Sequence, residues 1–482
     1  MVFNSIEFAI FLPVVFILYW FVFNRKLLWQ NLFIVIASYL FYGWWDWRFL
    51  FLIAFTSLCS WGSGFLISKY RNDGNKAKWI SIANIVLNLT ILGVFKYYDF
   101  FATSFANLFL GGKTDGILLN IILPVGISFY TFQALSYSID VYRGKLEPTK
   151  DIVEFFAFVS FFPQLVAGPI ERATNLLPQF QKERVFDYKQ ATDGMRQILW
   201  GMFKKVVVAD HCAIYVDEVF NTYQTQSGSA LLLGAIMFAF QIYGDFSGYS
   251  DISIGTSKLF GIKLMRNFNV PYFSRDIAEF WRRWHISLTT WFRDYIYIPL
   301  GGSRCSKGKI IRNTFIIFLV SGFWHGANWT FIAWGAYHAV LFLPLILSGK
   351  NRKYKEVVAI DKSLPTFKEV GQMLLTFLLV VVGWIIFRAE SFGQVWEYMC
   401  GMVQWETLKA GYDFFIQPDI RVKSWMAIFM LVIEWIDRRE EHALCMFNVR
   451  NKFVRFSIYF ILTLIVIFSF EKDPAQFIYF QF

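Results

Sequence analysis

Long apolar stretches recur along the whole chain and are separated by short polar segments. A helix that crosses a lipid bilayer needs about 20 mostly apolar residues. The stretches predict about a dozen membrane segments, at residues 6–23, 30–44, 49–67, 79–101, 117–141, 151–168, 197–220, 230–250, 313–330, 331–348, 371–388, 424–436 and 455–470. Several are short or interrupted, so we expect some to be re-entrant or buried in protein. The pattern predicts an all-α polytopic membrane protein with about 11–13 transmembrane helices.

One polar segment, at residues 275–298, has a helical periodicity of its own. At ~100° per residue its tryptophans and other apolar residues fall on one face, with Arg275, Arg282 and Arg293 opposite. This pattern is typical of an amphipathic helix that lies in the membrane interface. His285 falls at the edge of the apolar face, where it could assist catalysis, bind an anionic group or simply reach water.

The composition excludes a water-soluble fold. Hydrophobic residues make up 56% of the chain and charged residues 17%, whereas about a quarter of the residues are charged in a soluble domain. The 57 Phe and 19 Trp suit a lipid-facing surface with aromatic belts at both interfaces. Because no long polar linker interrupts the chain, we predict a single membrane domain over residues 1–482.

The net charge of +11 is spread over the loops between the apolar stretches. In membrane proteins such an excess collects in cytoplasmic loops, so we predict that the basic segments 69–78 and 143–150 are cytoplasmic. Basic loops can also contact anionic lipid headgroups. The lipid bilayer is therefore the partner that the charge pattern predicts, and scattered basic residues argue against a nucleic-acid partner.

The chain contains five histidines, and three of them have unusual surroundings. His325 lies in the sequence SGFWHGANW, between apolar stretches. An ionisable residue at membrane depth is costly and indicates function, although a histidine that is hydrogen-bonded between helices is the alternative. His338 could face the same cavity, but a helix-packing hydrogen bond is favoured for it, and His285 is the third. We interpret His211 and His442 as structural.

The residues favour one kind of chemistry over others. The histidines, cysteines and carboxylates lack metal-ligand spacing, so no metal site is predicted. The sequence contains neither a phosphate-binding P-loop nor a nucleophile elbow. A histidine without a partner nucleophile suits general-base catalysis on a hydroxyl group. Such a reaction needs an activated acyl donor such as a thioester, and we place it in a histidine-bearing core at residues 313–348.

Two further polar segments interrupt the apolar pattern. The segment DFSGYSD, at residues 245–251, could bind a cation, but we favour a structural role in which it caps and breaks a helix. The segment 162–170 is interrupted by proline and glycine, and it is typical of a re-entrant turn that lines a cavity.

Long motifs in fixed order resemble the membrane-bound O-acyltransferase family, in particular its branch of alginate O-acetylation membrane proteins. The matching stretches are FFPQLVAGPIER (161–172), YGDFSGYSDISIG (243–255), FWRRWHISLTTWFRDYIYIPLGGSR (280–304), SGFWHGANWTFIAWGAYH (321–338) and the closing FIYFQF (477–482). The resemblance extends over most of the chain. It implies a ring of helices, with interfacial and re-entrant helices, around a central tunnel where donor and acceptor meet.

The resemblance also implies roles for single residues. His325 matches the family's catalytic histidine, and His285 matches a second polar position that is also a histidine in this branch. Arg282, Arg283 and Arg293 could hold the phosphates of the donor by charge-assisted hydrogen bonds, with loop topology as the alternative explanation. Further candidates for tunnel or donor-binding positions are Trp324, Asn328 and His338. We expect His325 to act as a general base, with a transient acyl-imidazole as the alternative.

By the same resemblance, the expected function is transfer of an acetyl group from a cytosolic thioester donor across the membrane to an extracytoplasmic acceptor. The acceptor is an exported polysaccharide, which is O-acetylated at the bacterial plasma (inner) membrane. Acetyl-CoA is the expected co-substrate, no cofactor is expected to stay bound, and a secreted or membrane-anchored acetyltransferase is the expected partner. Export of D-alanyl or another acyl group from a carrier protein is the alternative within the family. A transporter is disfavoured, because the sequence shows no pair of related halves with broken helices.

Overall fold

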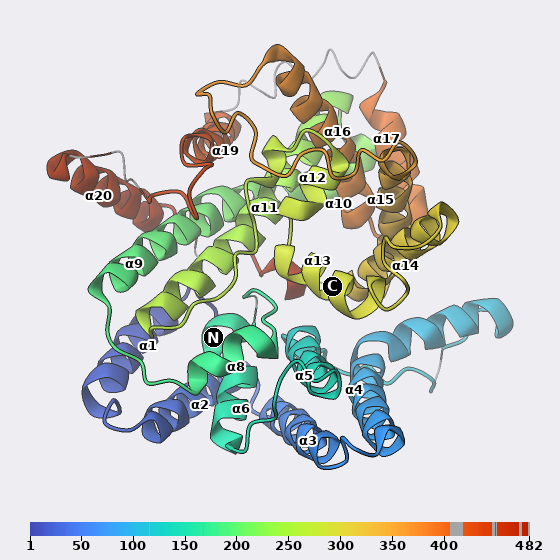
Figure 1. Cartoon of the computed structure of the whole chain (residues 1–482). Helices are drawn as coiled ribbons and strands as arrows, with labels where there is room; N and C mark the ends of the chain where they lie inside the picture. Colours follow the sequence, from blue (N-terminus) through green and yellow to red (C-terminus); the bar gives the residue numbers. More distant parts are fainter. Residues whose placement is uncertain are drawn as a thin grey trace. The chain divides into compact units, whose positions relative to one another are not determined.

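The structure is a computed structural model, and it describes residues 1–114, 116–166, 168–404, 418–445, 449, 451–471 and 475–480. All the regular elements in these ranges are helical (Figure 1). Contacts divide the chain into two compact units: residues 1–195 with 253–265, and residues 196–252 with 266–482. The prediction of an all-α protein is thus confirmed, whereas the single domain over 1–482 and the ring of helices stay predictions.

The first unit is built around a buried helix. Its elements are α1 (Ile6–Ile17), η1 (Leu18–Val22), α2 (Leu27–Gly43), α3 (Phe49–Lys69), α4 (Gly74–Phe109), α5 (Ile127–Tyr142), α6 (Ile152–Ser160), α7 (Phe162–Leu165), α8 (Ala173–Phe180) and the first half of α9 (Tyr188–Met202). The helices α3 and α4 pack on α5 and on each other (Figure 1). Every residue of α5 except Ile139 and Tyr142 is buried.

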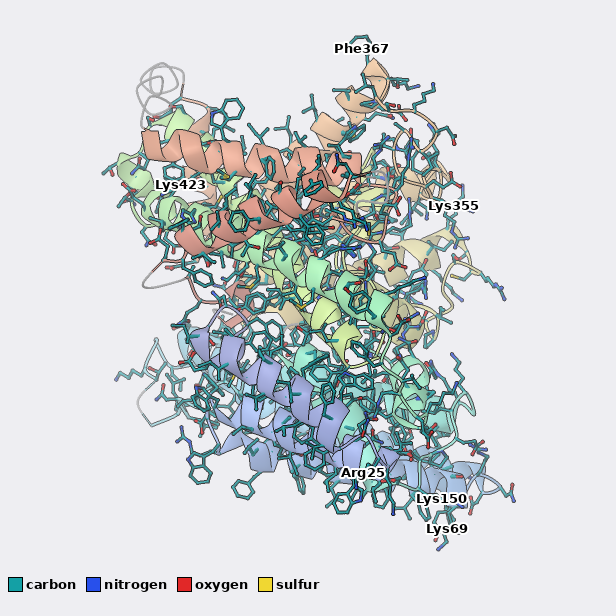
Figure 2. The ribbon with its side chains drawn as sticks, turned by 90° about the vertical axis from the view of Figure 1, so that its left-hand side faces the viewer. Arg25, Lys69, Lys150, Lys355, Phe367 and Lys423 are labelled. Carbon is teal, nitrogen blue, oxygen red and sulfur yellow. The ribbon has the colours of Figure 1, made fainter. Side chains whose placement is uncertain are left out.

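The two basic loops predicted to be cytoplasmic come together in the first unit. Arg71 pairs with Glu147 at 2.6 Å, and the Trp61 indole donates a hydrogen bond to the Thr149 carbonyl at 3.0 Å. Lys69 and Lys150 accordingly lie at the same end of this unit (Figure 2). These contacts are therefore compatible with both loops lying on the same side of a membrane.

The second unit is longer. Its elements are the end of α9, η2 (Phe203–Ala209), α10 (Asp210–Asn221), η3 (Tyr223–Thr225), most of α11 (Gly228–Leu259), η4 (Pro271–Phe273), α12 (Ile277–Arg283), α13 (Ile286–Phe292), η5 (Arg293–Tyr297), α14 (Lys307–His325), α15 (Trp329–Leu347), α16 (Phe367–Arg388), α17 (Phe392–Met402), α19 (Pro418–Ile436), α20 (Lys452–Phe468) and η7 (Ile478–Phe480). The helices α14 and α15 form an antiparallel hairpin, and α16 packs on α15.

Among the residues that the structure describes, five helices are long and apolar enough to cross a membrane: α3, α4, α11, α15 and α16. The combined segment α1–η1 and the helix α2 are apolar but shorter. Other predicted segments are shortened in the structure. Residues 117–126 precede α5 without regular structure, and the predicted segment 151–168 is split into α6 and α7. Together with its composition, these helices identify the chain as a polytopic membrane protein.

Two sequence-based predictions need correction. The predicted amphipathic helix 275–298 is not continuous, because His285 takes a left-handed backbone conformation (φ 44°) between α12 and α13. Arg283 and Trp284 beside it are buried, so this stretch packs within the protein rather than presenting one polar face. The segment 245–251 does not break a helix, since α11 continues through it to Leu259.

Candidate active site

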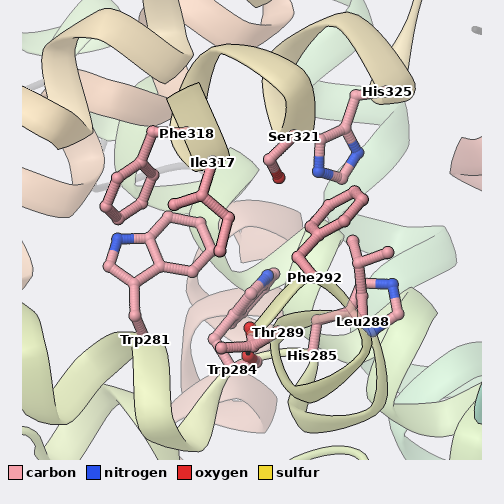
Figure 3. A pocket seen from close by; sticks show the side chains of 10 residues that line it. All are labelled: Trp281, Trp284, His285, Leu288, Thr289, Phe292, Ile317, Phe318, Ser321 and His325. Atoms are coloured by element: carbon pink, nitrogen blue, oxygen red, sulfur yellow. Dashed lines mark hydrogen bonds between the residues drawn. The ribbon is translucent and has the colours of Figure 1, made fainter. Parts of the chain in front are cut away.

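The second unit contains a cavity of about 60 Å³ between the α12–α13 segment and α14 (Figure 3). Most of its wall is aromatic or aliphatic, and two histidines interrupt it. The lining residues are Trp281, Trp284, His285, Leu288, Thr289, Phe292, Ile317, Phe318, Ser321 and His325. The structure thus brings together the two histidines that the sequence marked as catalytic candidates.

His325 is the last residue of α14 and is only 4% exposed. Its ring packs at right angles against Trp334 and Phe387, with centroids 5.0 and 5.2 Å away. Close packing of the α14–α15 hairpin fixes this position, because a Cβ at Gly322 or Gly326 would collide with Phe331 on α15. The two glycines that flank His325 in sequence are therefore needed for the approach of the helices.

His285 is 1% exposed and is held by a polar contact inside the second unit. Its Nδ1 lies 3.1 Å from Oδ1 of Asn267. The ring of Phe246 meets the imidazole edge-on at 4.6 Å. Burial lowers the pKa of His285 from its ordinary value of 6.5 to about 3, so the imidazole is neutral at physiological pH. A neutral imidazole in a strained backbone conformation is typical of a functional position.

Two aromatic residues lie against both histidines. Trp324 is 4.9 Å from His325 and 5.9 Å from His285, measured between ring centroids. Tyr479, from the C-terminal element η7, is 5.6 Å from His325 and 6.4 Å from His285. We did not identify Tyr479 as a site residue from the sequence, although the closing motif FIYFQF was a signal that could have found it.

A second, larger cavity of about 650 Å³ is lined by five cationic side chains: Arg282, Arg283, Arg293, Arg352 and Lys355. Its other lining residues are Asn269, Ile286, Thr289, Thr290, Phe342 and Asn351. Thr289 also lines the histidine cavity, so this one residue belongs to the wall of both. A basic cavity beside an apolar cavity with two histidines suits a ligand that has an anionic part and a reactive uncharged end.

The comparisons with known proteins agree with this geometry. The family model described as "MBOAT, membrane-bound O-acyltransferase family" matches residues 149–353, which include both histidines and four of the five cationic side chains, all except Lys355. The chain is 42% identical to the "Probable alginate O-acetylase AlgI" of Pseudomonas aeruginosa, over 84% of this chain and 76% of that protein. The chain belongs to the membrane-bound O-acyltransferase family. It is therefore an O-acyltransferase.

Two further relatives show how broad this family is. The chain is 32% identical to the "Peptidoglycan O-acetyltransferase" of Helicobacter pylori, over 98% of this chain and 95% of that protein. It is 30% identical to the "Teichoic acid D-alanyltransferase" of Bacillus subtilis, over 57% of this chain and 70% of that protein. The three relatives are all named for the transfer of a small acyl group.

The three predicted donor-binding arginines line the basic cavity of this O-acyltransferase, but they differ in their partners. Arg282 donates hydrogen bonds to the carbonyl oxygens of Asn351 and Tyr354, at 2.8 and 2.6 Å. Arg283 is buried and forms an ion pair with Glu279 at 2.8 Å. Arg293 is exposed and pairs with Asp294 at 2.7 Å. Arg283 thus has a structural role in addition to any role in binding.

The other predicted residues lie around the cavities rather than in them. Asn328 is the N-cap of α15, where it accepts a hydrogen bond from the Thr330 amide and donates one to the Glu390 carbonyl. His338 is fully buried, and its Nδ1 accepts a hydrogen bond from the Trp281 indole at 3.4 Å. The alternative of a helix-packing histidine fits His338, which lines neither cavity.

The carboxylates of the DFSGYSD segment pair with buried lysines. Lys205 lies 2.7 Å from Asp245 and 2.8 Å from Asp210, and it also donates a hydrogen bond to the Ala475 carbonyl. Lys204 pairs with Asp251 at 2.5 Å. Asp245 additionally accepts a hydrogen bond from the Ile478 amide at 2.7 Å. These ion pairs favour the structural role, since they hold the segment that carries Tyr479.

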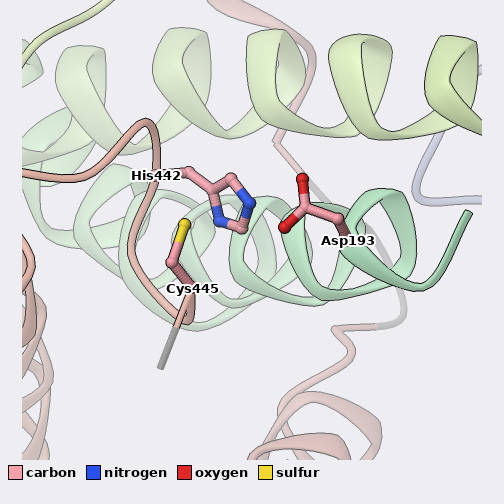
Figure 4. Close-up of side chains that lie close together, drawn as sticks. All are labelled: Asp193, His442 and Cys445. Atoms are coloured by element: carbon pink, nitrogen blue, oxygen red, sulfur yellow. The ribbon is translucent and has the colours of Figure 1, made fainter. Parts of the chain in front are cut away.

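Figure 4 draws Asp193, which belongs to the first unit, and His442 and Cys445, which belong to the second. Within the first unit, Asp193 pairs with Lys258 at 2.6 Å. Within the second, Nδ1 of His442 lies 2.5 Å from the Ala443 carbonyl oxygen. Because the three residues belong to separate units, no metal centre is inferred from them. The absence of a metal site stays a prediction.

Proposed function

We propose that this protein acetylates hydroxyl groups of an exported polysaccharide, with acetyl-CoA as the donor. The observation that carries the proposal is the pair of adjoining cavities, one with two histidines and one with five cationic side chains. The names of the alginate and peptidoglycan relatives support the acetyl group and the polysaccharide. For such an enzyme we propose a location in the inner membrane of a bacterium.

The basic cavity supplies the donor half of this proposal. Acetyl-CoA carries several phosphate charges at the end remote from its thioester, and arginines bind phosphate by charge-assisted hydrogen bonds. Arg282 still has a buried Nε without a hydrogen-bond partner among the described residues. Phosphates held here would leave the uncharged thioester arm free to extend past Thr289 toward the histidines.

The histidine cavity supplies the chemistry. In the proposed reaction His325 takes the proton of the acceptor hydroxyl while the hydroxyl oxygen attacks the thioester carbon. The carbon–sulfur bond breaks, and CoA leaves as the thiol once its sulfur has gained a proton. The apolar wall excludes water, which would otherwise compete with the acceptor for the acetyl group. A transient acetyl-imidazole on His325 is the alternative course.

The activity is tested with purified protein in liposomes and radiolabelled acetyl-CoA. His325→Ala should lower the rate of CoA release and of acceptor labelling by about 10²–10⁴-fold, the usual contribution of a general base. His211→Ala removes a histidine that lies outside the cavity and should keep the wild-type rate. A folded His325→Ala enzyme with wild-type activity would contradict the role of His325.

The donor site is tested in the same assay. The double variant Arg352→Gln/Lys355→Gln should raise the KM for acetyl-CoA about tenfold with little change in kcat, since it removes charged contacts to phosphate. Lys350→Gln removes an exposed charge from the same loop, outside the cavity, and is the matched control. An unchanged KM in the double variant would place the donor elsewhere.

The D-alanyltransferase relative supports a second candidate within the family, the export of a D-alanyl or other acyl group. For this candidate we propose a carrier protein as the donor. A protein surface could use the same cationic side chains. No CoA release from the wild-type enzyme, together with transfer from an acyl-loaded carrier protein, would favour this candidate. A secreted or membrane-anchored acetyltransferase that receives the acetyl group is the partner that we propose for either case.

A further inference from the structure

Asn267 is fully buried, and it is hydrogen-bonded to the segment that carries His285. Its carbonyl oxygen accepts a hydrogen bond from the Ile286 amide at 2.8 Å. Its side-chain oxygen Oδ1 lies 3.3 Å from the Ser287 amide nitrogen and 3.1 Å from Nδ1 of His285. Its side-chain nitrogen Nδ2 donates a hydrogen bond to Oγ of Ser250 on α11, at 3.0 Å.

The partners of Asn267 determine where the proton of His285 lies. A backbone amide can only donate, so the side-chain atom of Asn267 that meets the Ser287 amide must be the oxygen. The same oxygen faces Nδ1 of His285 and can only accept. Oγ of Ser287 lies 3.4 Å from Nδ1 but donates its own proton to the Asn267 oxygen at 2.9 Å, so Nδ1 carries the proton. In a neutral imidazole, the other nitrogen, Nε2, is then an acceptor with a free lone pair.

Nε2 of His285 is buried and has no hydrogen-bond partner among the described residues. A buried polar atom without a partner costs free energy, and at a functional site it indicates a group that completes its hydrogen bonds with a ligand. His285 lines the histidine cavity (Figure 3), so a ligand there is the available partner.

We infer that Asn267 is a positioning residue, which fixes His285 as the Nδ1–H tautomer and presents Nε2 to the cavity as an acceptor. The inference deepens the proposed function and rests on it for the identity of the ligand. His285 would accept a hydrogen bond from an O–H or N–H group of the bound substrate. It could not stabilise a negative oxygen of the reacting acyl group, because that task requires a donor.

The tautomer is tested without any measurement of activity. The protein is labelled with ¹⁵N-histidine and reconstituted in lipid nanodiscs, and the signals of His285 are assigned by their loss in His285→Gln. The wild-type spectrum should show His285 neutral, with Nδ1 protonated and Nε2 bare. Asn267→Leu should move the proton partly or wholly to Nε2. A wild-type His285 with Nε2 protonated would overturn the inference, whatever the enzyme's substrate.

The consequence for catalysis is tested with a conservative variant. Asn267→Asp keeps an acceptor for Nδ1–H, and its charge raises the pKa of His285, so the acid limb of the pH–kcat profile should move to higher pH. Asn267→Leu should lower kcat about 100-fold with little change in KM, the scale of a group misplaced by about 1 Å.

The matched control is Ser287→Ala, which removes a hydroxyl donor to the same oxygen of Asn267, together with the 3.4 Å contact of that hydroxyl with Nδ1 of His285. The contact between Nδ1 and Asn267 is left in place. It should keep the wild-type acid limb. If Asn267 only stabilises the fold, Asn267→Asp and Asn267→Leu should lower the amount of folded protein to similar extents and leave the acid limb in place. That result would contradict a role in positioning.

Discussion

At the scale of single residues, the charge state of His285 links the site to stability. Its pKa is lowered from 6.5 to about 3 in the folded protein, so between these values the unfolded chain binds more protons. The contribution of neutral His285 to the unfolding free energy is therefore fully present above pH 6.5 and falls as the pH falls toward 3.

The pH dependence of stability gives a prediction at this scale. Each pH unit below 6.5 should remove up to about 1.4 kcal/mol from the unfolding free energy of the wild type. His285→Gln has no group that titrates there, so its unfolding temperature in detergent should fall less between pH 6.5 and 4. Parallel pH dependence of the two proteins would contradict a neutral, buried His285.

The sequence identified some of these residues and could not identify others. His325 and His285 were recognisable because an ionisable side chain among apolar neighbours is unusual in local sequence. Asn267 has no such signal, because its importance comes from contacts with residues of other elements. Tyr479 could have been found only through the closing motif FIYFQF, since its contacts with the histidines join distant parts of the chain. The ion pairs of Lys204 and Lys205 were missed for the same reason.

At the scale of elements, the α14–α15 hairpin was predictable, whereas the break in front of α13 was not. Two apolar stretches joined by a short polar turn predict two packed helices, and the structure has them. The periodicity of residues 275–298 favoured one continuous helix. Buried hydrogen bonds to Asn267 instead hold His285 at φ 44°, so tertiary contacts override the local preference.

The close approach of α14 and α15 gives a prediction for two glycines on one helix. A Cβ at Gly322 would collide with the Phe331 carbonyl oxygen, whereas a Cβ at Gly308 would meet nothing within 4 Å. Gly322→Ala should lower the unfolding free energy by about 1–3 kcal/mol or more, as overpacking does. Gly308→Ala should be neutral or stabilising by up to about 1 kcal/mol. Thermal unfolding of both variants in detergent checks this, and equal midpoints would contradict the packing.

At the scale of the whole molecule, the recurring apolar stretches and the composition were enough to predict an all-α membrane protein. The number of full spans was less predictable, because short and broken apolar segments look alike in sequence whether they cross a membrane or pack inside the protein. The residues 162–170 are such a case: the sequence predicts a re-entrant turn there, and the structure has the short helix α7 at its start.

The central proposal is that His325 acts as the general base when an acetyl group passes from acetyl-CoA on one side of the membrane to an acceptor hydroxyl on the other. The most direct measurement uses sealed proteoliposomes with radiolabelled acetyl-CoA outside and a hydroxyl-bearing polysaccharide enclosed inside. We predict that the enclosed polymer gains label with the wild-type protein and not with folded His325→Ala, while the released CoA is found outside. Equal labelling by the two proteins, or labelling only of polymer added outside, would contradict the account.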